Sequence, residues 1–121
     1  MGHPTIYPTG VTVYNPEKCW NGFTIFQALE VGAVLMNMNG RENKVWKGVH
    51  GFPNKIFPGG YLMTSRGSRD GRYGVQDGLD LVQIDWDGNV VWKFDRNEYI
   101  EDPGIPGRWM ARSHHDYQRE G

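Results

Sequence analysis

The sequence predicts an all-β fold, and three observations lead to this prediction. The 121-residue chain contains 17 glycines and 5 tryptophans, a combination typical of a turn-rich protein whose core is filled by large aromatic rings. Its apolar segments are short, rich in β-branched and aromatic residues, and bounded by Gly, Pro, Asn or Asp. No segment of the sequence offers a sustained helical face with a cap at both ends. A chain of this length is long enough for one domain with a modest core.

Five short segments are the expected strands. They are residues 22–26, 33–38, 60–66, 79–86 and 89–95. The dipeptides Asn39-Gly40 and Asp87-Gly88 each predict a hairpin with a two-residue turn. Such turns need positive φ angles, which Asn, Asp and Gly tolerate.

An imperfect internal repeat indicates how the strands are organised. Residues 34–48 and 81–95 each contain an apolar strand, a turn ending in Asn-Gly or Asp-Gly, and a second strand ending in Val-Trp-Lys. Repeats of about 40 to 50 residues with about four short strands have the period of propeller blades. We therefore expect a single all-β domain over residues 1–121: a partial β-propeller of about two four-stranded blade units and the start of a third, too short to close a ring alone.

The expected blade boundaries follow from this repeat. They are the N-terminal strands of a first blade at 9–48, a blade unit at 49–95, an insertion loop at 96–109 and the start of the next blade at 110–121. An open stack of blades leaves apolar faces and an unpaired strand exposed. Three explanations remain open: a piece of a longer polypeptide, assembly with copies of the same chain, or a different small β fold. The first is favoured and self-assembly is second.

Composition and charge exclude some classes of function. The formal net charge of −1 argues against a nucleic-acid partner, which would need a basic face. No run approaches the roughly 20 apolar residues of a membrane helix, and residues 1–10 lack the apolar stretch of a signal peptide. The single cysteine, Cys19, excludes an internal disulfide and is expected to be buried. The cellular compartment stays unknown.

Two histidines, His50 and His115, follow the two copies of the repeat and are the first candidates for a site. For His50, a role in a site and a hydrogen bond to a neighbouring strand are equally good interpretations. His114 and His115 are adjacent, so in a strand they would point to opposite faces and at most one of them would serve a site. Together with Asp116 they do not supply the ligands of a zinc site, so no metal is predicted.

Longer motifs around these residues occur together in one known family. They are TGVTVYNPEKCWNGFTIF (9–26), LMNMNGRENKVWKGVHGFPNKIFPGGYLMTSR (35–66), LDLVQIDWDGNVVWKFD (79–95) and HHDYQREG (114–121). In combination they resemble the N-terminal part of the arylsulfotransferase (aryl-sulfate sulfotransferase) family, from about Thr9 to the last residue. The resemblance implies a propeller, generally six-bladed, in which each blade begins with an inner strand that often carries a histidine.

The resemblance also implies a chemistry and roles for residues. Members transfer a sulfuryl group from a phenolic sulfate to another phenol through a sulfohistidine, without a nucleotide donor, and no cofactor is implied. His115 would contact the donor or stabilise the leaving group, and His50 would be a second, axial candidate. Arg66 would bind the sulfate, because a guanidinium donates two parallel hydrogen bonds to such anions. The family's nucleophilic histidine lies in a later blade and has no match here.

The expected function is therefore that of a fragment of an aryl-sulfate sulfotransferase-like protein, incomplete in this chain, with an aromatic sulfate donor and a phenolic acceptor as partners. The alternative is a non-catalytic β-structural protein that associates with itself or with others through exposed strand edges.

Overall fold

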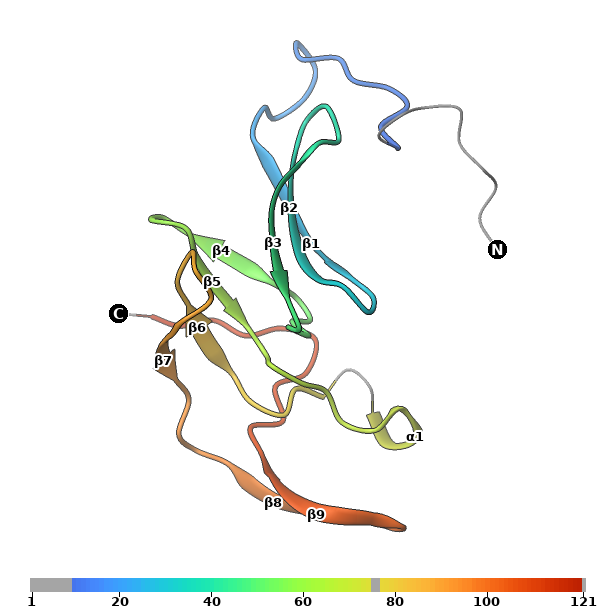
Figure 1. The fold of residues 1–121 in the computed structure, drawn as a ribbon, viewed down its shortest axis with the longest axis vertical. Coiled ribbons are helices and arrows are strands. Elements are labelled where there is room, and N and C mark those ends of the chain that lie inside the picture. The colour runs from blue at the N-terminus through green and yellow to red at the C-terminus, as the bar shows by residue number, and fades with distance from the viewer. Residues whose placement is uncertain (1–9, 75–76, 121) are drawn as a thin grey trace.

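The structure, a computed structural model, describes residues 10–74 and 77–120 of the chain. Thr9, where the expected first blade begins, lies outside these ranges. The described residues form three antiparallel β-sheets and one short helix, which confirms the predicted all-β class (Figure 1). The sheets follow one another along the long axis of the molecule, in the order of the sequence.

The first sheet, called sheet A here, has the strand order β1-β2-β3. Its strands are β1 (Phe23–Ala28), β2 (Gly32–Asn37) and β3 (Glu42–Lys47). Sheet B is a four-stranded meander in the order β4-β5-β6-β7. Its strands are β4 (Lys55–Phe57), β5 (Tyr61–Thr64), β6 (Val82–Ile84) and β7 (Val90–Lys93). The third sheet is a hairpin of β8 (Glu98–Asp102) and β9 (Ile105–Met110).

Helix α1 (Gly71–Gly74) is a single turn in the connection between β5 and β6. Within the described part of the chain, no helix has the length and apolar character needed to cross a membrane.

The first repeat copy forms a hairpin whose turn differs from the prediction. Asn37 N donates to Arg41 O at 2.9 Å, and Asn37 Oδ1 accepts the main-chain N–H groups of Asn39 and Arg41, both at 3.0 Å. Gly40 has a positive φ of 76°, whereas Asn39 does not. The turn is therefore a three-residue loop ending in a left-handed glycine, not the expected two-residue primed turn.

The second repeat copy has the same turn geometry. Asp85 N donates to Asn89 O at 2.9 Å, and Asp85 Oδ1 accepts the N–H groups of Asp87 at 2.9 Å and Asn89 at 2.8 Å. Gly88 is the left-handed residue, with φ 91°. The expected two-residue turn at Asp87-Gly88 is corrected in the same way. Asn and Asp serve equally at the first position because each has a short side chain with an acceptor oxygen.

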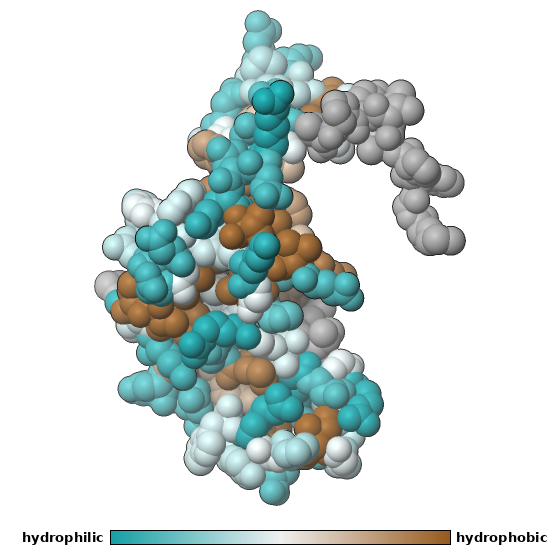
Figure 2. Space-filling model, viewed as in Figure 1, coloured by the Kyte–Doolittle hydropathy of each residue, from teal (hydrophilic) through white to brown (hydrophobic). Residues whose placement is uncertain are grey.

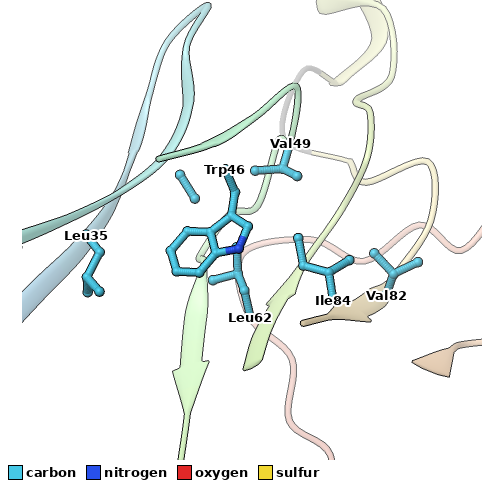
Figure 3. Packing of buried hydrophobic residues seen from close by; sticks show 7 residues of the cluster. Leu35, Trp46, Val49, Leu62, Val82 and Ile84 are labelled. Carbon is cyan, nitrogen blue, oxygen red and sulfur yellow. The ribbon is translucent and has the colours of Figure 1, made fainter. Parts of the chain in front are cut away.

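Sheets A and B share one apolar core, shown in Figure 3. The Trp46 side chain on β3 is only 4% exposed and lies among residues of both sheets. Its Nε1 donates to the main-chain oxygen of Asp85 at 3.2 Å, so sheet A is hydrogen-bonded to the β6–β7 turn of sheet B. The cluster consists of Ala33, Leu35, Trp46, Val49, Leu62, Val82 and Ile84.

A chain of amide and hydroxyl groups also joins the two sheets. Asn54 Nδ2 donates to Gln27 Oε1 at 2.9 Å, and Asn54 Oδ1 accepts from Thr64 Oγ1 at 2.7 Å. Gln27 Nε2 donates to Val49 O at 2.9 Å. Asn54 and Thr64 are buried, so these bonds satisfy polar groups that would be costly to bury unpaired.

The last described residues cross the face of sheet B that points away from sheet A. Strand register places four residues in one row on that face: Lys55, Met63, Gln83 and Trp92. Lys55 Nζ donates to Tyr117 O at 2.6 Å, and Arg119 Nη1 donates to Gln83 Oε1 at 2.9 Å. The Arg119 guanidinium lies 4.7 Å from the centroid of the Trp92 ring. Trp92, the repeat counterpart of the buried Trp46, is only half-buried beneath this segment.

Two expectations about the chain's organisation are corrected. The range 96–109, expected to be an insertion loop, contains the β8–β9 hairpin, in which the paired rings of Tyr99 and Trp109 lie edge to face at 5.5 Å. Pro106 lies inside β9, where it is tolerated because a two-stranded sheet consists of edge strands. Cys19, expected to be buried, is exposed.

Candidate functional site

Three segments far apart in the sequence meet at one end of sheet B. Ser68 forms a β-bridge with Gly78, and Gly78 forms another with Ser113. Gly78 N donates to Ser113 O at 2.7 Å, and Ala111 N donates to Leu79 O at 2.9 Å. A Cβ at Gly78 would lie 2.4 Å from Ser113 Oγ, so any other residue would have to displace the Ser113 side chain. The bridges place the residues after Ser68, before Gly78 and after Ser113 side by side.

A network of charged side chains lies beside these β-bridges. Arg69 Nη1 donates to Asp77 Oδ2 at 3.0 Å, Arg69 Nε donates to Asp102 Oδ2 at 2.9 Å, and Arg69 Nη2 donates to Asp102 Oδ1. Asp77 Oδ1 is bonded to Nδ1 of His114. The side chains of Arg69 and Asp77 are 16% and 11% exposed, whereas that of His114 is 46% exposed. His114 is thus the solvent-facing end of a largely buried network.

The pKa shifts within this network show which of its groups are ionised. Burial opposes the ionisation of Asp77, but hydrogen bonds from Arg69 and His114 outweigh it and lower the pKa of this carboxyl. The hydrogen bond from Arg69 is the main cause that lowers the pKa of Asp102, and bonds to Asp102 and Asp77 raise the pKa of Arg69. All three groups are therefore ionised at neutral pH.

The tautomer of His114 follows from its partner. An ionised carboxylate can only accept hydrogen bonds, so Nδ1 of His114 must carry a proton that it donates to Asp77. In the neutral ring the lone pair is then on Nε2. An imidazole oriented in this way by a carboxylate is suited to accept a proton or to act as a nucleophile.

His114 and His115 do not point to opposite faces, as a strand would require. Their ring centroids are 4.1 Å apart, with the planes at 73°. The expected geometry fails because His115 has a positive φ of 63° and lies in a tight reversal between the bridged residues His114 and Asp116, not in an extended inner strand. Both imidazoles can therefore contribute to one surface.

His115 connects this network to a pocket through a contact with Phe52. The rings of Phe52 and His115 meet edge to face with centroids 5.3 Å apart. Phe52 in turn lines a pocket of about 420 Å³, together with His50 and five other residues. These others are Gln27, Leu29, Glu30, Gly51 and Ser68. The pocket is mainly apolar, and no Lys or Arg is among the described residues that line it. It suits an aromatic ring better than an anion.

Of the predicted site residues, His50 lines this pocket, His115 contacts the pocket residue Phe52, and Arg66 lies elsewhere. His50 is exposed at the pocket, and its main-chain N–H donates to Ser65 O at 2.7 Å. Arg66 lines a different pocket of about 440 Å³ between β3 and the β6–β7 turn. There Arg66 Nε donates to Asp80 Oδ2 at 2.8 Å, so its charge is partly neutralised.

Several residues of this site are not predicted from the sequence. Asp77 is 37 positions from His114, and Arg69 is 33 positions from Asp102. The sequence predicts no role for Arg69, Asp77, Asp102 or Phe52. The run of arginines and aspartates near α1 was a signal of ion pairing, but only the bridges between segments decide which pairs form.

The structure holds no cluster of three or more His, Cys, Asp or Glu side chains that could bind a metal, as far as its described ranges extend. Comparisons of the chain with protein-family models, with curated proteins and with solved structures give no match.

Proposed function

We propose that this chain is part of an aryl-sulfate sulfotransferase-like propeller and supplies a surface that binds the aromatic part of its substrates. The observation that carries the proposal is that Phe52 links the two predicted histidines: it lines a pocket with His50 and contacts the ring of His115. These histidines follow equivalent repeats and are 65 positions apart, and Phe52 contacts His115 while lining the pocket of His50.

The packing of the sheets supports the propeller part of the proposal. In sheet A, the face that carries Trp46 packs on sheet B. The corresponding tryptophan of sheet B, Trp92, is on the face that looks away from sheet A, in the row with Met63 and Gln83. Repeated stacking of one sheet face on the next sheet is how propeller blades are arranged. A further sheet would therefore be expected on the Trp92 face, where residues Tyr117 and Arg119 now lie.

The chemistry of the pocket supports the aromatic part. Phenyl rings bind to aromatic side chains through edge-to-face contacts, each contributing about 0.5–1.5 kcal/mol beyond area burial. The sulfate group needs donors or cations, whereas the charged residue that lines the pocket is the acidic Glu30. The cation for the sulfate is then expected from outside this pocket, either from a further blade or from a rearranged Arg66.

Binding of three probes tests this proposal: 4-nitrophenyl sulfate, 4-nitrophenol and inorganic sulfate, each followed by NMR chemical-shift changes in the isotope-labelled chain. We expect both aromatic probes, but not inorganic sulfate, to shift the signals of Phe52 and His50. His115→Ala should weaken aromatic binding by about 1 kcal/mol, roughly fivefold. Gln118→Ala, at an exposed neighbouring position, is the matched control. Absence of aromatic binding, or equal binding of sulfate alone, would refute the proposal.

Transfer itself requires a second assay. The chain is mixed with 4-nitrophenyl sulfate and a different phenol, and mass spectrometry detects the sulfated acceptor. Transfer that is lost in His115→Ala would support an enzyme built from this chain. Stable oligomers or fibres without binding or transfer would instead favour the assembly function.

Exposed apolar strands favour self-association as the second candidate. Val90 and Val91 on β7 are 43% and 51% exposed, and Phe23 on β1 is 64% exposed. Figure 2 shows apolar patches between hydrophilic groups on one face of the molecule. Both β1 and β7 are outer strands of their sheets, which are natural sites for pairing with another chain. Sedimentation of the wild type and of Val91→Lys tests this, because an inserted charge on the outer strand should reduce association.

A further inference from the structure

We propose that His114, positioned by Asp77, is the general base of this site and takes the proton from a phenolic hydroxyl bound beside His115 and Phe52. The proposal rests on the proposed function for its substrate class. It names a residue to which the sequence assigned no role and a step that the pocket alone does not explain.

The geometry supplies the first argument. Nδ1 of His114 is held by Asp77, and the His114 side chain is 46% exposed. The ring contacts His115, which contacts Phe52. These contacts form a continuous series of rings from the pocket to His114. In the proposed complex the phenol lies on His115 and Phe52, and its hydroxyl meets Nε2 of His114.

The surrounding charges supply the second argument. Arg69 contributes one positive charge, and Asp77 and Asp102 contribute two negative charges, so the network has a net charge of −1 before His114 is protonated. A proton on His114 neutralises it. Farther out, Arg108 and Asp70 act on Asp102 with opposite effects on its pKa. The ring of His115 contacts that of His114 as well, and Asp116 is bridged to His114 through the main chain.

The proposed step is a simple proton transfer. The phenolic O–H bond breaks and its electron pair stays on the oxygen, while a new N–H bond forms at Nε2 of His114. The ring becomes an imidazolium whose Nδ1–H still donates to Asp77. The resulting phenolate is a stronger nucleophile toward a sulfuryl group than the phenol. Asp77 acts through His114 and is thus a positioning residue.

Binding of 4-nitrophenol tests the step without any sulfate donor, because its phenolate absorbs visible light. At a pH just below that at which the free phenol ionises, we expect added protein to increase the phenolate absorbance until the site is saturated. His114→Gln should abolish this increase while binding, followed by NMR, persists. His115→Gln should weaken binding, but the phenol that still binds should ionise.

Variants of two aspartates separate positioning from folding. Asp77→Asn should shift the ionisation of the bound phenol by about one pH unit, a tenfold change in its ionisation constant, and Asp77→Glu should restore part of it. Asp85→Asn is the control, because Asn37 holds the equivalent turn in sheet A. Nitrogen-15 NMR of the imidazole should show Nδ1 protonated in the wild type and a mixture of tautomers in Asp77→Asn.

The outcomes distinguish this inference from the proposed function. An equal absorbance increase in wild type and His114→Gln, binding without ionisation, or no binding of 4-nitrophenol would each overturn the inference. Ionisation that depends on His114, together with a lack of sulfuryl transfer in every assay, would leave the inference standing and count against the sulfotransferase proposal. A wild-type His114 that carries its proton on Nε2 would also overturn it.

Discussion

The indole Nε1 of Trp46 donates a hydrogen bond to the main-chain oxygen of Asp85, 39 residues along the chain and in the next sheet. The Trp46 ring also meets the Trp86 ring edge to face, with centroids 5.3 Å apart. Lys44 Nζ lies over both rings, at 5.8 Å and 5.2 Å from their centroids. This contact joins the two repeat copies and fixes how their sheets pack.

Replacement of the two repeat tryptophans should have unequal effects. Trp46→Phe removes the hydrogen bond to Asp85 and leaves a gap in a closed core, so we expect the free energy of unfolding to fall by about 1–3 kcal/mol. Trp92→Phe, at a half-buried position under Arg119, should cost less than about 1 kcal/mol. Urea denaturation measures both. Equal losses would show that Trp46 does not hold the sheets together.

Gly51 should not tolerate a side chain. A Cβ there would lie 2.0 Å from Asn54 Oδ1 and 2.7 Å from Thr64 Oγ1. Gly51→Ala must therefore displace the buried amide network, and we expect a loss of about 1–3 kcal/mol. Gly22→Ala is the control, since nothing lies within 4 Å of its added Cβ. Thermal unfolding of the two variants should differ clearly, and a Gly51→Ala variant as stable as Gly22→Ala would contradict the clash.

The cost of replacing Gly88 in the second hairpin turn should arise from its backbone conformation alone. Gly88 has φ 91°, and nothing lies within 4 Å of an added Cβ. Gly88→Ala should therefore cost about 1–2 kcal/mol through the left-handed backbone, while Gly88→Asn should cost less because Asn tolerates this region better. Chemical denaturation provides the comparison. If Ala and Asn were equally tolerated, the cost would not arise from φ.

Stability should depend on pH through the network around Arg69. The folded-state pKa values of Asp77 and Asp102 lie below the ordinary value of 3.8. The stabilisation is therefore complete above that value and is lost as the pH falls through the folded-state pKa values. Thermal unfolding between about pH 5 and pH 2 should show a falling midpoint, and Asp102→Asn should flatten this dependence. A midpoint that stays constant over the range would exclude these carboxylates as the cause.

Local sequence patterns predicted the strands of the repeat well, because strand pairing there involves neighbours along the chain. Each hairpin places its partners a few residues apart, and Asn37 and Asp85 hold their turns with atoms of the same turn. The all-β class follows from such local signals. The number of residues in each turn did not, since Asn-Gly and Asp-Gly are compatible with both two-residue and three-residue loops.

The candidate site could not be predicted from the sequence, because its contacts form between distant segments of the chain. His50 and His115 were found by the repeat, yet the orientation of His115 depends on a positive φ that its sequence context did not indicate. The pairing of His114 with Asp77 requires the bridges through Gly78. Arg66 was predicted from its motif, but the side chain of Asp80 holds it at another pocket.

The amino-acid sequence by itself determined the β class, the repeat and its two hairpins, because these arise from side-chain alternation and turn chemistry within a few residues. Only the tertiary structure decided which face of each sheet is covered, that residues 96–109 form a hairpin, and that Asp77 meets His114. These features depend on packing and charge pairing between segments tens of residues apart, where the free energy of one contact depends on all the others that bring the segments together.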